Sequence, residues 1–144
     1  MLKISKKSNI IYYKYIINMK ELKAKILIAD DDKAYLLVLK QGFLKGGFDV
    51  TTVENGHEAL IAAKKEKFDL IIFDIAMPEI GGVAAAKKLK DLEINVPIIF
   101  LTNLKDAEHI GEAVEAVVNT DYIIKSDISV ESLVERVKNK LNIK

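Results

Sequence analysis

Five short apolar runs, separated by longer stretches of helical character, constrain most strongly what this chain can fold into. The runs are rich in Ile, Val and Phe, and they are nearly continuous rather than alternating in polarity. Continuous runs of this length are typical of strands covered on both faces, as in a parallel sheet. The predicted strands span residues 26–29, 48–53, 70–73, 96–101 and 122–124.

Each predicted strand is followed by a stretch of helical character. In the last of these, an apolar stripe runs from Val130 to Leu141, and Ser129 is placed to cap its start. Gly46 and Gly47 supply a stop for the first helix. Five repeats of strand and helix, joined by right-handed crossovers, predict a doubly wound α/β fold. The predicted helices lie within residues 36–43, 58–67, 83–92, 105–118 and 130–141.

The composition limits the classes of function. The 144 residues fit one domain, and the net charge of +1 argues against direct binding to nucleic acid. The chain has no cysteine, which excludes disulfides and thiolate metal sites and agrees with a cytoplasmic location. His57 and His109 lie in polar helical surroundings, and neither is predicted to be a ligand.

Residues 1–22 differ from the rest of the chain because they carry five lysines and no acid before Glu21. Their apolar stretch is interrupted by Lys14, so it is too short for a membrane span, and it lacks the features of a signal peptide. Met19 resembles a natural start. We therefore expect a disordered extension or an artefact of an upstream start, with the folded domain at residues 23–144; a basic amphipathic anchor or partner-binding segment is the alternative.

Chemically active residues follow four of the five predicted strands. Asp30 and Asp31 follow the first strand, Asp74 the third, Thr102 the fourth and Lys125 the fifth. Because the carboxyl ends of parallel strands meet at one edge, these side chains are expected to converge on one pocket. Clustered carboxylates repel one another unless a cation lies between them, and oxygen ligands without His or Cys favour Mg²⁺. One carboxylate is then placed to act as a nucleophile in phosphoryl transfer.

Four short motifs stand at these strand ends. They are Ile-Leu-Ile-Ala-Asp-Asp-Asp at 26–32, Asp-Ile-Ala-Met-Pro at 74–78, Leu-Thr at 101–102 and Tyr-Ile-Ile-Lys at 122–125. Together they resemble the receiver domain of response regulators in two-component systems, in a stand-alone, chemotaxis-regulator-like form. The resemblance covers residues 24–142 and implies a flavodoxin-like, three-layer α/β/α fold with a five-stranded parallel sheet in the order 2-1-3-4-5.

The resemblance implies a role for each residue of the pocket. Asp74 would accept a phosphoryl group from the phosphohistidine of a histidine kinase or phosphotransfer protein. Asp31 would bind Mg²⁺ directly and Asp30 mostly through water, with Asp74 and the backbone carbonyl of Ala76 as further ligands. Lys125 would contact the phosphoryl group. The chain is then a signalling phosphoacceptor rather than an enzyme, with only self-directed phosphotransfer and autodephosphorylation.

The resemblance also implies how the signal would leave the pocket. Thr102 would move towards the phosphoryl group and Tyr122 would change rotamer with it. This change would alter the face formed by the helix at 105–118, the strand at 122–124 and the last helix. A downstream protein, or a second copy of the chain in a homodimer, would bind there.

Several positions depart from the family pattern. Gly81-Gly82 replaces a common Asp-Gly, which is expected to loosen this loop and alter the cap of the next helix. Ser126 replaces a proline that usually follows a cis peptide, and Asn103 replaces a small residue. Ala76 and Leu104 occupy positions that orient or exclude the attacking water in this family. Since neither side chain can hydrogen-bond water, slow autodephosphorylation is predicted.

Two other functions compete with this one. A phosphate-independent, receiver-like interaction module would keep the fold without the chemistry, but the intact set of acids, Thr and Lys argues against it. An enzyme on the same fold is disfavoured because Ala76 stands where an aspartyl-phosphate hydrolase has its second acid, and because the acids at 30–32 would repel a flavin phosphate. The sequence leaves open the cognate kinase, the input signal, the target and the sign of regulation.

Overall fold

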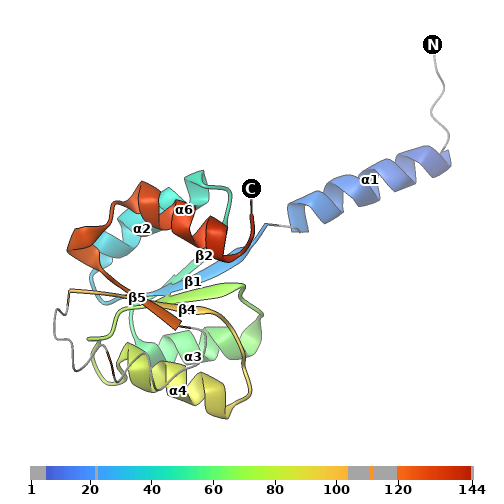
Figure 1. Ribbon diagram of the computed structural model, residues 1–144. Helices are drawn as coiled ribbons and strands as arrows, with labels where there is room; N and C mark the ends of the chain where they lie inside the picture. Colours follow the sequence, from blue (N-terminus) through green and yellow to red (C-terminus); the bar gives the residue numbers. More distant parts are fainter. Residues whose placement is uncertain (1–5, 22, 104–110, 112–119, 144) are drawn as a thin grey trace.

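The structure, a computed structural model, describes residues 6–21, 23–103, 111 and 120–143. A five-stranded parallel sheet in the order β2-β1-β3-β4-β5 lies at its centre (Figure 1). This confirms the predicted doubly wound α/β fold and the strand order 2-1-3-4-5. The strands are β1 Lys25–Ala29, β2 Asp49–Val53, β3 Leu70–Phe73, β4 Ile98–Thr102 and β5 Thr120–Ile124.

Helices cover both faces of the sheet and complete three layers (Figure 1). Helices α2 (Lys33–Lys45) and α6 (Val130–Lys140) pack on one face. Helices α3 (Gly56–Lys65) and α4 (Gly82–Asp91) pack on the other. The helix predicted over 105–118 lies outside the described residues, apart from position 111.

The continuous apolar runs of the three central strands supply side chains to both layers of the core. Ile26 and Ile28 of β1 pack beneath α2 and α6, whereas Leu27 and Ala29 pack beneath α3 and α4. Every residue of β3 and β4 is buried in the same way. Burial on both faces is why these strands show no polar alternation.

Individual residues determine where the helices and strands begin and end. The side chain of Ser129 accepts a hydrogen bond from the backbone N–H of Ser132, which confirms the predicted cap of α6. Helix α2 ends at Gly46, as predicted, and Gly47 follows with a φ of 92° that favours glycine. Strand β4 begins after Pro97 rather than at Val96, since proline has no N–H for the ladder.

Residues 6–21 form a helix, α1 (Lys6–Glu21), which projects away from the three-layer body (Figure 1). The sequence favoured a disordered extension here, whereas the described segment is helical. It contains neither glycine nor proline, so nothing in its backbone chemistry interrupts a helix. No helix in the described part of the chain is long and apolar enough to cross a membrane.

Candidate functional site

The carboxyl ends of β1 and β3 bring two buried aspartates together. The strands are paired in register so that Ala29 lies beside Phe73, and the next residues are Asp30 and Asp74. The backbone N–H of Asp74 donates to the carbonyl of Ala29 at 2.9 Å, which extends the pairing by one step. Both aspartates are less than one-tenth exposed. Two buried carboxylates at neighbouring strand ends require a positive charge nearby, because a buried charge without a partner is costly.

Lys125, directly after β5, supplies that charge. Its Nζ lies 2.6 Å from Oδ2 of Asp30 and 3.2 Å from Oδ2 of Asp74. The lysine side chain is itself nearly buried. One ammonium therefore bridges both acids, as the convergence of strand ends predicted.

The pKa values of Lys125 and Asp74 are both raised, which favours the charged form of the lysine and disfavours the charged form of the acid. Burial raises the pKa of the Asp74 carboxyl, and this effect outweighs the lowering by Lys125. Burial alone would lower the pKa of Lys125, but its hydrogen bond to Asp30 and the charges of Asp74 and Asp30 raise it above its ordinary value. Lys125 is therefore a permanent cation at neutral pH, and Asp74 carries a charge that burial disfavours.

The loop after β3 wraps closely around Asp74. The backbone N–H of Ala76 donates to Oδ1 of Asp74 at 3.3 Å, and the N–H of Gly82 donates to the carbonyl of Ile75 at 3.0 Å. A Cβ at Gly82 would clash with the backbone carbonyl oxygen of Asp74. Gly82, which matches the glycine of the family's Asp-Gly, therefore lets α4 begin close against Asp74. The looser loop expected from Gly81 stays a prediction. The altered cap is present, because Gly81 offers no side chain to cap α4.

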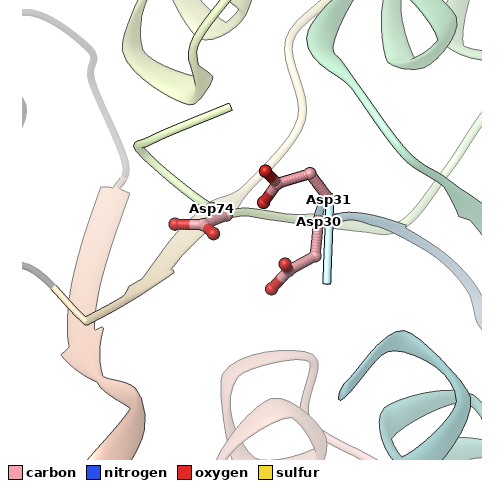
Figure 2. Close-up of side chains that lie close together, drawn as sticks. All are labelled: Asp30, Asp31 and Asp74. Atoms are coloured by element: carbon pink, nitrogen blue, oxygen red, sulfur yellow. The ribbon is translucent and has the colours of Figure 1, made fainter. Parts of the chain in front are cut away.

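Three carboxylates make a set suited to a hard cation. Oxygens of Asp30, Asp31 and Asp74 all lie within 4.8 Å of one another. Figure 2 shows the three side chains side by side, two from the end of β1 and one from the end of β3. Asp31 is exposed, so the group opens to solvent on one side. This set of oxygen donors fits Mg²⁺, which prefers carboxylates and retains several waters.

The other predicted residues differ in their position and in their burial. Thr102, the last residue of β4, is fully buried. Tyr122 lies on β5 beside Phe100, and its side chain is 44% exposed. Ser126 lies in a short 3₁₀ turn, Lys125–Asp127, and the described residues contain no cis peptide. Asn103 is exposed and His57 is exposed, whereas Leu104 and His109 lie outside the described residues.

Two contributors to the site were not predicted from the sequence. The ring of Tyr35 lies beneath Lys125, with Nζ 4.7 Å from the ring centroid. The side chain of Asp32 accepts a hydrogen bond from the backbone N–H of Tyr35 and so caps α2, and the N–H of Asp32 donates to Asp30. The Asp-to-Tyr spacing of three residues fits an N-cap, which was the available signal. The contact between Tyr35 and Lys125 has no signal in the sequence, because it joins positions 90 residues apart.

Comparisons with known proteins show which family this chain resembles. The family profile of the response regulator receiver domain matches residues 26–138. The transcriptional regulatory protein ZraR of Salmonella typhimurium is 36% identical over 104 residues, which are 72% of this chain and 23% of ZraR. The response regulator SaeR of Staphylococcus epidermidis is 37% identical over 117 residues, 81% of this chain and 49% of SaeR. The chain thus spans a quarter to a half of the length of these relatives.

Solved receiver domains have the same fold. The receiver domain of the Francisella response regulator 1452 superposes with a TM-score of 0.76 at 32% identity, covering 83% of this chain and 98% of that one. A CheY-like receiver domain protein of Methanospirillum hungatei gives the same TM-score at 30% identity, covering 83% of this chain and 94% of that one. The profile match, the sequence similarity and the shared fold together show that this chain belongs to the response regulator receiver domain family of two-component systems.

Proposed function

We propose that this chain is a phosphorylation switch in which Asp74 accepts a phosphoryl group from a phosphohistidine. The observation that carries the proposal is the bridge from Lys125 to both Asp30 and Asp74 in a nearly buried pocket. A carboxylate oxygen of Asp74 would attack phosphorus, a P–O bond would form and the P–N bond would break. The imidazole would leave with the electron pair and take up a proton.

Lys125 would neutralise charge on the transferred oxygens. In the structure its ammonium already contacts Asp74, so the phosphoryl group would arrive within reach of a fixed cation. Asp31 and Asp74, the Ala76 carbonyl and, through water, Asp30 would hold Mg²⁺. When bound, the metal supplies positive charge for the phosphoryl oxygens and the attacking carboxylate.

The signal would pass from Thr102 to Tyr122. Thr102 is buried at the end of the strand next to β3, and its hydroxyl would turn towards a phosphoryl oxygen. The half-exposed Tyr122 would turn inward in response. The surface that changes would comprise β5, α6 and the helix predicted over 105–118. A downstream protein, or a second copy of the chain, would recognise that surface.

The donor would be a histidine kinase or a phosphotransfer protein. Receiver domains interact with such proteins as a class, and the pocket offers the acid, cation and oxygen ligands that a phosphohistidine donor requires. Loss of the phosphoryl group by hydrolysis would be slow. Ala76 and Leu104 cannot orient a water molecule for attack, and a half-life of a few seconds with Mg²⁺ at neutral pH would contradict this.

Treatment with acetyl phosphate and Mg²⁺, followed by intact mass measurement, tests the proposal. The wild type should gain one phosphoryl group, and Asp74→Asn should gain none. Asp121→Asn is a matched control, since Asp121 pairs with Lys140 at the other edge of the sheet, and it should react like the wild type. No mass gain in the wild type would favour the phosphate-independent interaction module.

Mg²⁺ binding has its own readout. Added Mg²⁺ should raise the temperature of thermal unfolding, because a ligand that binds only the folded state stabilises it. Asp31→Asn should abolish most of this rise, while Asp121→Asn should keep it. An equal rise in all three proteins would contradict the proposed ligand set.

A further inference from the structure

Helix α1 presents large apolar side chains to solvent. Ile10, Ile11, Tyr12, Tyr13 and Tyr15 are each between 56% and 64% exposed. At helical spacing Ile11, Tyr12 and Tyr15 share one side of α1, and Lys6, Lys7 and Lys14 lie on the other. Figure 1 shows no element of the body against the helix. A helix with this much uncovered apolar surface needs an external surface to bury it.

The charge on the same segment is predominantly positive, and Glu21 at its end is the one acid of α1. Residues 1–20 contain five lysines and no acid. Lys6 and Lys7 lie in the first turn of α1, which contains no acidic residue. Positive charge at a helix N-terminus is unfavourable, because the helix dipole is also positive there. An anionic surface near the first turn would reverse this effect.

The helix also lacks internal stabilisation. It has 16 residues, only slightly more than the ~12–15 below which isolated helices are marginal in water even for alanine-rich sequences. Seven of its 16 residues are isoleucine or tyrosine, which have a lower helix propensity than alanine or leucine. Its stability should therefore depend on a surface outside the receiver domain.

We propose that α1 binds in the plane of an anionic lipid bilayer and tethers the receiver domain to it. Tyrosines prefer the boundary between headgroups and acyl chains, where ring and hydroxyl are both satisfied. Ile11 would enter the acyl boundary, and Lys6, Lys7 and Lys14 would contact lipid phosphates with their stems along the apolar surface. The interaction is peripheral, since α1 cannot span a bilayer.

The topology suits this arrangement. Helix α1 precedes Lys25, the first residue of β1, so it joins the amino edge of the sheet (Figure 1). The acid pocket follows Ala29, the last residue of the same strand. A membrane bound by α1 therefore lies at the opposite end of β1 from Asp30 and Asp31, and the pocket stays open to a partner.

A second copy of the chain fits the helix less well. Each copy of α1 carries four lysines and a single acid, Glu21, so most lysines would have no acidic partner in a pair of helices. Like charges across a helix interface disfavour association. Dimerisation through α1 is therefore the alternative outcome of the test.

Vesicle co-sedimentation tests the proposal directly. The full chain should sediment with vesicles of phosphatidylcholine containing phosphatidylglycerol, but not with phosphatidylcholine alone, and binding should weaken with salt. Ile11→Ser with Tyr15→Ser should abolish binding. Leu37→Ser with Leu44→Ser, on α2, changes side chains that are 56% and 49% exposed and should leave it intact. Lys7→Gln with Lys14→Gln should weaken partitioning about 25-fold, at about fivefold per lysine.

Other outcomes would overturn the proposal. These are a wild type that stays in the supernatant with anionic vesicles, equal binding to neutral vesicles, or loss of binding in the α2 control. Self-association in lipid-free buffer that Ile11→Ser with Tyr15→Ser removes, without vesicle binding, would assign α1 to a second copy. Asp74→Asn should bind vesicles like the wild type, so this test does not depend on the phosphorylation proposal.

Discussion

A lysine pairs with acidic side chains at both the carboxyl and the amino edge of the sheet, but it is nearly buried at the first and exposed at the second. At the carboxyl edge, the Lys125 side chain is 10% exposed and bridges Asp30 and Asp74. At the amino edge, the Lys25 side chain is 43% exposed and pairs with Glu66 at 3.5 Å. Charge pairing alone therefore does not identify a functional site in this fold. Burial of the charges distinguishes the two edges, because a buried charge that loses its partner is costly while an exposed one is solvated by water.

The largest difference should appear when each lysine is removed. Lys125→Met leaves two buried carboxylates without their cation, and it should lower the free energy of unfolding by about 3 kcal/mol in metal-free buffer. Lys25→Met should change it by less than about 1 kcal/mol. Urea unfolding of both variants measures this. Equal losses would remove the distinction between the edges.

Each edge also has a position that requires glycine, for a steric reason at Gly82 and for a backbone-dihedral reason at Gly47. Gly82→Ala forces a Cβ against the Asp74 backbone and should cost about 2 kcal/mol of stability. At the amino edge, Gly47→Ala has open space but a φ of 92°, and it should cost about 1 kcal/mol. The phosphorylation rate separates the two: it should fall in Gly82→Ala and stay at the wild-type value in Gly47→Ala. A normal rate in Gly82→Ala would mean that Asp74 tolerates displacement.

The pH dependence of stability should report the burial of Asp74. Burial raises its pKa in the folded state, so the folded protein binds more protons than the unfolded chain above the ordinary Asp range. In metal-free buffer the wild type should therefore lose stability, relative to Asp74→Asn, as pH rises from that range through the raised pKa. Unfolding curves of both proteins across acidic pH test this. If the wild type instead gained stability relative to Asp74→Asn as pH rises, the folded state would stabilise the charged form of Asp74.

The smallest effect concerns Tyr35. Tyr35→Leu removes the ring beneath Lys125 and should cost about 1 kcal/mol, whereas Tyr35→Phe should keep most of the stability. In a Lys125→Met background the cost of Tyr35→Leu should shrink, since the cation is gone. An unchanged cost in that background would mean that Tyr35 contributes packing only.

The sequence predicts the residues that lie along strands better than those that meet across elements. The apolar run at 70–73 coincides with β3, and its end at Phe73 places Asp74 at the carboxyl edge. Asp30 and Lys125 follow from the same argument applied to β1 and β5. These predictions succeed because parallel pairing aligns strand ends regardless of side-chain detail.

Contacts between elements could not be predicted in this way. The position of Tyr35 beneath Lys125 depends on how the start of α2 lies relative to the turn after β5, and the need for Gly82 depends on how closely α4 approaches Asp74. Neither distance is encoded in a local pattern. Residues 1–22 were expected to be a disordered extension or an artefact of an upstream start. Their described part, residues 6–21, is the helix α1, which the lack of glycine and proline permits.

The most direct test of the account is to locate the phosphoryl group. Protein treated with acetyl phosphate and Mg²⁺ can be reduced with borohydride, which converts an aspartyl phosphate to homoserine, and then mapped by peptide mass spectrometry. We expect homoserine at position 74 and at no acid of the amino edge, such as Asp69 or Asp121. Homoserine at another aspartate, or none in a protein that has gained a phosphoryl group, would contradict Asp74 as the acceptor.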